Sequence, residues 1–290
     1  MTAPHDRRDH VLRAITDDGA FRVIVVQATR TVQEAIRAQK VDGEAARLFA
    51  DLLTGAVLVR ETMAPDLRVQ AILQAKDLKS RMVADTHPDG MTRGLWLPRE
   101  GADGAAFALG SDARLQVART LHNGAPHQGV VEVPEQRGIS GALMNYMQSS
   151  EQVVSVIAVG TYMAAGEVVA AGGYIVQLLP EVGEGPLMVM TERLDDFQRI
   201  DKLLEAGSAE PRALLAELLY GMPYTEVGEA DVHFGCNCSR ERILSSLATL
   251  PRHEVHELYE RGEVLEIACD YCKKEYRIGA EQLRGLLGSN

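Results

Sequence analysis

The stretch FGCNCSRERI (residues 234–243) decides the fold of the last fifth of this 290-residue chain, together with its counterpart ACDYCKKEYR (residues 268–277). The first pair of cysteines has C-x-C spacing, the second has C-x-x-C spacing, and 30 residues separate the pairs. Two such pairs can surround one zinc ion with a tetrahedron of thiolates. We therefore predict one Zn²⁺ per chain in the reduced protein. Its ligands are all the cysteines of the chain: Cys236, Cys238, Cys269 and Cys272.

Histidine is the alternative ligand type, since His233, His253 and His256 lie close to the cysteines in the sequence. Four cysteines already complete a tetrahedral shell. We therefore expect that the histidines do not bind the metal.

The metal is expected to decide whether this region folds. A segment of about 60 residues buries too little surface to be comfortably stable alone, whereas structural zinc contributes on the order of 10 to 16 kcal/mol to folding. Thiolates are also the species that peroxide oxidises to disulfides, and a disulfide sulfur is a poor metal ligand. Of the three possible pairings, Cys236 with Cys238 and Cys269 with Cys272 close the smallest loops, so we expect these disulfides after oxidation.

Composition and charge narrow the class of protein. Hydrophobic residues make up 46% of the chain, which is ample for a packed core, and the net charge is −11. The acidic balance argues against nucleic acid as a partner. The polar start, MTAPHDRRDH, lacks a secretory signal, and no segment is apolar over the length that spans a bilayer. We expect a soluble cytoplasmic protein with no membrane partner. Cysteines stay reduced in the cytoplasm.

Residues 1–180 are predicted to form one large α+β domain with sheets. Apolar runs and alternation predict strands over 21–29, 67–74 and 114–121, the last including Leu121. A capping box places the start of a helix at Thr31, and apolar residues at three- and four-residue spacing predict a longer helix after Asp42.

Residues 139–152 are predicted to form a further helix of this domain.

Residues 181–230 are predicted to be a helical linker, and residues 231–290 a small tetrathiolate zinc domain. After a break at EVGEGP, helices are expected over 191–207 and 211–220, with Ser208 as N-cap of the second. Residues 183–230 hold ten acidic and four basic side chains, a net charge of −6. The two helices carry apolar faces that contain Leu203, Leu204, Leu214, Leu215, Leu218 and Leu219.

The sequence resembles the redox-regulated heat shock protein 33 chaperones. The resemblance is most specific in CNCSRER (236–242) and CDYC (269–272), and it extends over almost the whole chain. Further similar segments are KSRMVAD (79–85), MTRG (91–94), QGVVEV (128–133), YMQSSEQ (146–152) and AAGGYIVQLLP (170–180).

The resemblance implies an ATP-independent holdase rather than an enzyme. Such a protein is inactive when it is reduced and zinc-bound. Once oxidised it loses zinc, its linker and C-terminal region unfold, and it binds unfolding client proteins, generally as a homodimer. Melting of the zinc domain would then release the apolar faces of residues 181–230, and exposed apolar surface is what a client-binding site needs.

Three other functions are considered. A constitutive structural zinc-ribbon module that binds nucleic acid or protein is the main alternative, although residues 231–290 hold ten acidic and eight basic side chains. A thiol oxidoreductase needs one exposed low-pKa cysteine, whereas here both pairs are expected to share a metal. An enzyme in the first domain is disfavoured because no nucleophile elbow, P-loop or dinucleotide fingerprint is found.

Overall fold

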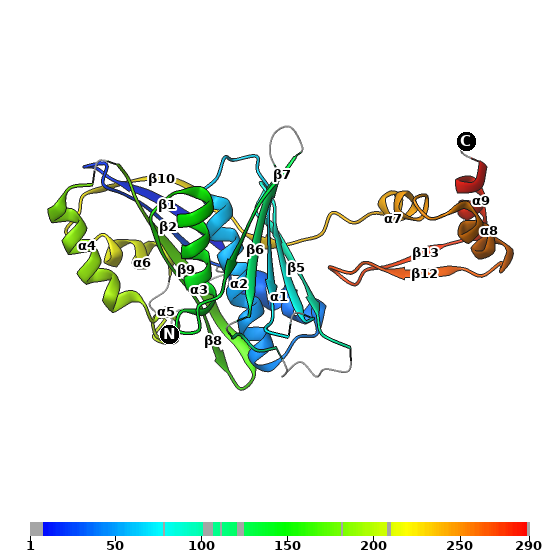
Figure 1. Cartoon of the computed structure of the whole chain (residues 1–290), viewed down its shortest axis with the longest axis horizontal. Coiled ribbons are helices and arrows are strands. Elements are labelled where there is room, and N and C mark those ends of the chain that lie inside the picture. Colours follow the sequence, from blue (N-terminus) through cyan, green and yellow to red (C-terminus); the bar gives the residue numbers. More distant parts are fainter. Residues whose placement is uncertain are drawn as a thin grey trace. The chain divides into compact units, whose positions relative to one another are not determined.

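The protein has an α+β fold, seen here in a computed structural model (Figure 1). The structure describes residues 8–77, 79–100, 107–110, 112–120, 125–180, 182–207 and 210–288, so the predicted N-cap Ser208 and the strand residue Leu121 lie outside the described residues. Two compact units are present, Met1–Phe234 and Gly235–Asn290. Within the described ranges, no helix is both long enough and apolar enough to span a bilayer.

The first unit contains two sheets. The five-stranded sheet is antiparallel, with strand order β10-β1-β2-β9-β8. The six-stranded sheet has the order β11-β5-β4-β3-β6-β7, and only its short edge strand β11 runs parallel to its neighbour. The five-stranded sheet consists of β1 (His10–Thr16), β2 (Phe21–Gln27), β8 (Ser155–Ala164), β9 (Glu167–Leu178) and β10 (Tyr224–Asp231). The six-stranded sheet consists of β3 (Val69–Gln74), β4 (Arg81–Thr86), β5 (Met91–Leu97), β6 (Arg114–Thr120), β7 (Pro126–Glu132) and β11 (His233–Phe234).

Three helices lie between the two sheets: α1 (Thr29–Gln39), α2 (Gly43–Glu61) and α3 (Gly138–Tyr146) (Figure 1). Helix α2 contacts strands of both sheets, which explains why it is buried nearly all round rather than along one stripe. Its side chains Phe49, Leu52 and Leu58 are fully buried in the main core. The apolar spacing after Asp42 therefore predicted the central helix of the unit correctly.

The N-terminus of α1 differs from the prediction. The helix begins at Thr29, so Thr31 is its third residue rather than its N-cap. The backbone N–H and the hydroxyl of Thr31 both donate to the carboxylate of Asp9, at 2.6 and 2.7 Å. A residue 22 positions upstream thus satisfies the helix end, which a local capping pattern cannot reveal.

The segment predicted to be a linker packs against the five-stranded sheet. It forms α4 (Glu184–Phe197), α5 (Ile200–Glu205), α6 (Pro211–Leu218) and then strand β10. The sheet presents two apolar faces: on β2, Ile24 and Val26 point into the main core, whereas Val23 and Val25 join a second cluster with these helices. We call this second cluster the outer cluster; its fully or mostly buried members are Leu12, Ala14, Ala20, Phe21, Val23, Val25, Ala158, Tyr174, Val176, Met190, Leu194, Ile200, Leu204, Leu214, Leu215, Leu218 and Leu219.

All six leucines predicted to form apolar faces pack in the outer cluster, five of them buried and Leu203 half-buried. The helix predicted over 191–207 is instead two helices. Helix α4 starts at Glu184, within the expected break, and ends at Phe197, whose carbonyl accepts a hydrogen bond from Tyr174. Ile200 of helix α5 then lies over Gly160. A Cβ added at position 160 would lie 2.6 Å from the Ile200 side chain.

Helix α3 is followed by a π-helix over Met147–Glu151, so the helix predicted over 139–152 changes its hydrogen-bonding pattern after Tyr146. Gln152 ends it in the left-handed region, with φ of 58°. The helix predicted from 211 corresponds to α6, and Glu210 caps it by accepting a hydrogen bond from the Ala213 N–H at 2.8 Å.

The second unit is small and has little apolar core. Its sheet has two antiparallel strands, in which Leu265 pairs with Ile278. Among its described residues, the apolar cluster contains only three fully or mostly buried members, Val255, Ile278 and Leu283. The elements of this unit are α7 (Arg240–Leu247), α8 (Arg252–Glu260), β12 (Leu265–Ala268), β13 (Glu275–Ile278) and α9 (Ala280–Gly288).

Candidate metal centre

The first cysteine pair lies in the loop that precedes α7. Ser239 caps this helix by accepting a hydrogen bond from the Arg242 N–H at 3.3 Å. The side chain of Arg242 turns back and donates to the carbonyl oxygen of Asn237 at 3.0 Å. Because Asn237 stands between Cys236 and Cys238, the helix and its cap fix the loop that carries both thiols.

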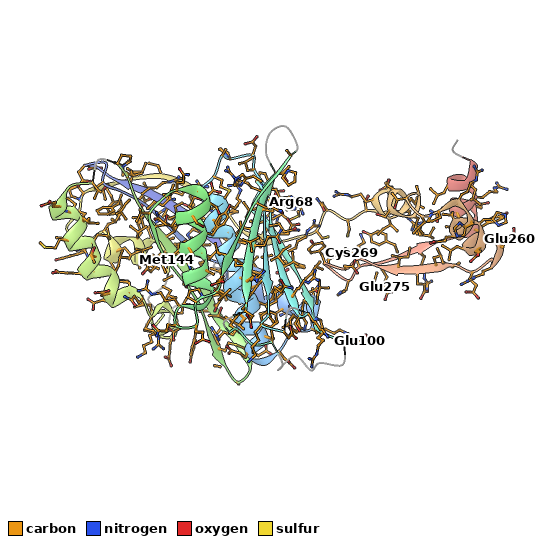
Figure 2. All side chains as sticks on the ribbon, viewed as in Figure 1. Arg68, Glu100, Met144, Glu260, Cys269 and Glu275 are labelled. Carbon is orange, nitrogen blue, oxygen red and sulfur yellow. The ribbon has the colours of Figure 1, made fainter. Side chains whose placement is uncertain are left out.

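The second pair lies in the turn between β12 and β13, near which Figure 2 labels Cys269 and Glu275. The Cys269 N–H donates to the carbonyl of Lys274 at 2.9 Å, and the Lys273 N–H donates to the carbonyl of Cys269 at 2.8 Å. Lys273 has φ of 59°, the left-handed conformation that closes the turn. The turn therefore holds Cys269 and Cys272 on one side of a tight loop.

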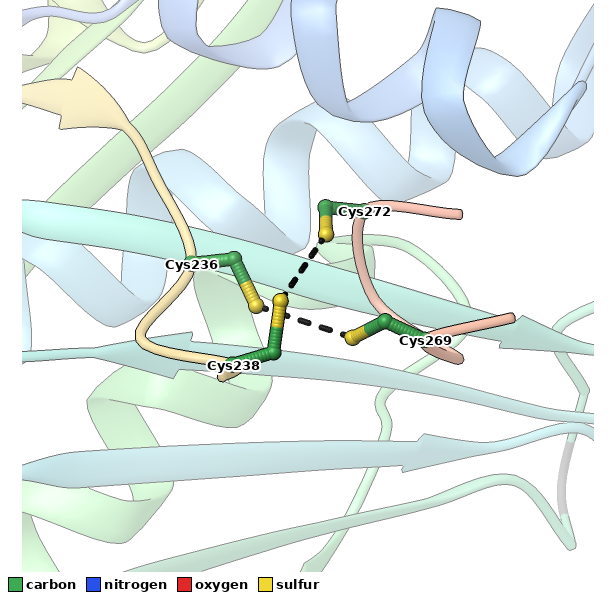
Figure 3. A group of neighbouring side chains, drawn as sticks. All are labelled: Cys236, Cys238, Cys269 and Cys272. Carbon is green, nitrogen blue, oxygen red and sulfur yellow. Dashed lines mark hydrogen bonds between the residues drawn. The ribbon is translucent and has the colours of Figure 1, made fainter. Parts of the chain in front are cut away.

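The four thiols converge (Figure 3). Their Sγ atoms all lie within 4.8 Å of one another, with 3.7 Å between Cys236 and Cys269 and 3.4 Å between Cys238 and Cys272. Four sulfurs at zinc–thiolate bond lengths form a tetrahedron with edges of about 3.8 Å. The four cysteines are close enough together to hold a metal ion, and their arrangement fits a zinc ion. None of the four cysteines is joined in a disulfide here, so the expected disulfides stay a prediction.

The electrostatics of the centre favour one easily formed thiolate. Burial opposes ionisation of Cys238, but hydrogen bonds from Tyr276 and the neighbouring thiols outweigh it and lower the pKa of this thiol to about 7. Burial raises the pKa of Cys272 to about 12. The two sulfurs are 3.4 Å apart and titrate as a pair, so the first proton leaves readily and the second leaves with difficulty. A bound cation would compensate the second charge.

Tyr276 is a contact that the sequence reasoning did not identify. Its hydroxyl donates a hydrogen bond to Cys238 Sγ at 3.0 Å, across 38 positions of sequence. The signal that was available is the alternation on β13, where Tyr276 and Ile278 are buried and Glu275 and Arg277 are exposed. That pattern indicates a buried ring, although it does not indicate a sulfur partner.

The three histidines considered as alternative ligands are not in the cluster. Among the described residues, the group of potential metal ligands consists of the four cysteines alone. His256 lies on α8 and faces Glu260 at 3.8 Å, and His233 lies on β11 in the first unit.

The first unit has buried charged groups of another kind. The fully buried carboxylate of Asp85 on β4 accepts hydrogen bonds from Arg68 at 2.5 Å and from Arg93 at 2.8 Å, and His87 lies 3.3 Å away (Figure 2 labels Arg68). Burial opposes its ionisation, yet these partners hold the pKa of Asp85 well below its usual range. This ion-pair network links β4 and β5 with the residue before β3, which is a structural role.

Comparison with known proteins adds to this geometry. The family model described as Hsp33 protein matches residues 9–279. The chain is 30% identical to the 33 kDa chaperonin of Syntrophotalea carbinolica, covering 97% of this chain and 99% of that protein. It is 29% identical to the 33 kDa chaperonin of Geobacter sulfurreducens, covering 97% of this chain and 95% of that one.

A solved structure has the same fold. The crystal structure of the 33 kDa chaperonin of Thermotoga maritima matches with a TM-score of 0.81 and 24% sequence identity. The match covers 97% of this chain and 98% of that chain. The likeness extends through both units described above.

Proposed function

Since the chain belongs to the Hsp33 family of chaperones, we propose that it is a redox-regulated holdase that binds unfolding client proteins without ATP. The observation that carries the redox part is the convergence of four cysteines within 4.8 Å, none of them joined in a disulfide. Such a cluster can bind a metal when reduced and cannot do so once its sulfurs are joined in disulfides.

Cys236, Cys238, Cys269 and Cys272 would hold one zinc ion in the reduced protein. When bound, zinc supplies folding free energy, on the order of 10 to 16 kcal/mol for structural sites of this kind. The second unit needs that contribution because only Val255, Ile278 and Leu283 are fully or mostly buried among the described members of its apolar cluster.

Oxidation by peroxide would proceed in two balanced steps. A cysteine thiolate attacks one peroxide oxygen, which forms an S–O bond, breaks the O–O bond and releases water after protonation. The sulfenic acid then condenses with the second thiol of its pair, which forms the S–S bond and releases another water. Each disulfide thus uses one peroxide and two electrons from sulfur. The cysteines, now uncharged, release the metal.

We expect the pairing to be Cys236 with Cys238 and Cys269 with Cys272. The sulfur distances do not decide the pairing, because all edges of a tetrahedral thiolate cluster are similar in length. Loop size favours the local pairs, which also leave the two halves of the unit unlinked and free to unfold. Disulfide mapping by mass spectrometry distinguishes local from crossed pairs.

Unfolding of the second unit would spread to the helices that cover the five-stranded sheet. The chain leaves the first unit through β10, an edge strand, and β11, a strand of two residues that directly precedes the cysteines. Strand β11 has only two residue pairs with β5, and β10 pairs with β1 on one side only, so fraying is expected to start at β11 and to pass through β10 to α4, α5 and α6. Release of these helices would expose the outer cluster, including Val23, Tyr174 and Val176, as apolar surface for clients.

The partners proposed are unfolding proteins and, for the active form, a second copy of the chain as a homodimer. The chain carries a net charge of −11, which argues against nucleic acid. Reduced thiols and a bound metal fit a cytoplasmic setting, in which oxidative stress is the exception.

Light scattering of a thermally aggregating substrate tests the proposal. The protein is added either reduced and zinc-loaded or after peroxide treatment and removal of excess oxidant. We expect protection from aggregation only in the oxidised state, together with the release of one zinc per chain. Equal protection in both states would contradict the redox switch, and full zinc retention after oxidation would favour a constitutive zinc module.

A further inference from the structure

The phenol of Tyr276 contacts a cysteine sulfur and is not part of the apolar cluster among the described residues of this unit. The side chain is 6% exposed and belongs to β13, four residues after Cys272. It shares a face of the strand with Ile278, which is part of the apolar cluster of this unit. Within the described part of the unit, that cluster does not include Tyr276.

The phenol joins the two cysteine-bearing segments. Its hydroxyl donates to Cys238 Sγ at 3.0 Å, and Cys238 Sγ lies 3.4 Å from Cys272 Sγ. Cys238 comes from the loop before α7, whereas Tyr276 and Cys272 come from the β12–β13 hairpin and its turn. The hydrogen bond therefore restrains the C-x-C loop against the hairpin independently of any metal.

The charge of the site makes this bond stronger than an ordinary neutral one. Four thiolates around a divalent cation carry a net charge of −2, and a hydrogen bond to an ionised acceptor is roughly twice as strong as a neutral one. The ammonium of Lys274 lies over the Tyr276 ring, 5.4 Å from its centroid, which places a positive charge next to the phenol.

We propose that Tyr276 is a positioning residue for the metal centre: its hydroxyl orients the Cys238 thiolate toward the ion and withholds that sulfur from oxidants. This inference rests on the proposed function, since it concerns the thiolates that peroxide attacks. The attack needs a sulfur lone pair directed at the peroxide oxygen. A hydrogen bond that occupies a lone pair of Cys238 slows the step in which the S–O bond forms and the O–O bond breaks.

The test is Tyr276→Phe in the full chain, with Tyr259→Phe as the matched control. Phenylalanine keeps the ring and removes only the hydroxyl. Tyr259 lies on α8 in the same unit, is half-buried and packs against the apolar cluster. The control therefore removes a hydroxyl from the same small unit at a position in its apolar packing.

The first readout is metal affinity, measured with Co²⁺ and a competing chelator through the thiolate-to-cobalt absorption band. Loss of a group that orients a metal ligand typically lowers affinity by about 10- to 100-fold. We expect a loss in that range, with a shifted absorption band, for Tyr276→Phe and a change of less than about twofold for Tyr259→Phe. Circular dichroism at saturating metal should be unchanged in both variants.

The second readout is the rate of peroxide oxidation of the zinc-loaded chains at fixed pH, followed by a zinc-binding dye and by trapping of sulfenic acid at Cys238. We expect Tyr276→Phe to react severalfold faster and to show more trapped sulfenic acid at Cys238. Two results would overturn the inference: behaviour equal to the control in both readouts, or failure of Tyr276→Phe alone to fold with saturating Co²⁺. If wild-type protein keeps its zinc in peroxide, the proposed function fails, while the Co²⁺ affinities still test Tyr276.

Discussion

Replacing one buried leucine of helix α6 should activate the reduced protein. Leu215 on α6 is fully buried in the outer cluster, against the face of the sheet that contains Val23 and Tyr174. Truncation of a buried leucine to alanine costs roughly 2 to 5 kcal/mol. If that cost falls on the packing of α6, the population with α6 detached rises about 30-fold to several thousand-fold, since about 1.4 kcal/mol is a factor of ten.

The assay is light scattering of an aggregating client with reduced, zinc-loaded Leu215→Ala, beside Leu187→Ala as control. Leu187 is on α4 and is 37% exposed, so the same chemical change removes little packing there. We expect Leu215→Ala to protect the client with one zinc still bound, and faster hydrogen exchange confined to α4–α6. Faster exchange of α6 without any protection by the reduced variant would refute the link between release of α6 and client binding.

Two further predictions concern the first unit. Burial raises the pKa of Asp51 to about 6 from 3.8, so its stabilising contribution is complete below pH 4 and is lost as pH rises through 6. In urea titrations, the free energy of unfolding of Asp51→Asn should therefore rise relative to that of the wild type by up to about 3 kcal/mol between pH 4 and pH 7. A difference between the two proteins that does not depend on pH would contradict this. Gly90 has φ of 82°, and a Cβ there would lie 1.9 Å from the carbonyl oxygen of Asp231. Gly19 is the control, because its φ is 71° and the space around it is open, so that Gly19→Ala should cost roughly 1 kcal/mol of backbone strain alone. Gly90→Ala should destabilise the β5–β11 pairing by more than that. Hydrogen exchange of residues 232–234 measures this, and equal exchange in the two variants would show that the close contact is unimportant.

Much of the fold follows from periodicity in the sequence. The apolar spacing after Asp42 and the alternation over β3 and β6 indicate elements whose burial is local and regular. Strand β10 gives no such signal, because its sequence YTEVGEAD carries acidic residues on an edge strand. It is a strand because it pairs with β1, 208 or more residues away in sequence. Pairing of this kind is set by tertiary structure, as is the capping of α1 by Asp9.

The site divides in the same way. Four cysteines in two close pairs predict a metal centre because ligand type and spacing are local properties. The phenol of Tyr276 was not found, since its partner lies 38 positions away and no spacing rule connects a tyrosine to a cysteine. The leucines of α5 and α6 were identified as apolar, but their packing against one face of the sheet depends on strands β2 and β9.

The central claim is that oxidation of the four thiols unfolds the second unit and frees the helices that cover the outer cluster. Hydrogen exchange of the same sample, reduced and then oxidised with peroxide while zinc release is recorded, tests it most directly. We predict that residues 235–288 and helices α4, α5 and α6 lose protection as zinc leaves, while α2 and the central strands β2 and β9 stay protected. Unchanged protection of 235–288 in fully oxidised protein, or zinc retained by it, would contradict the claim.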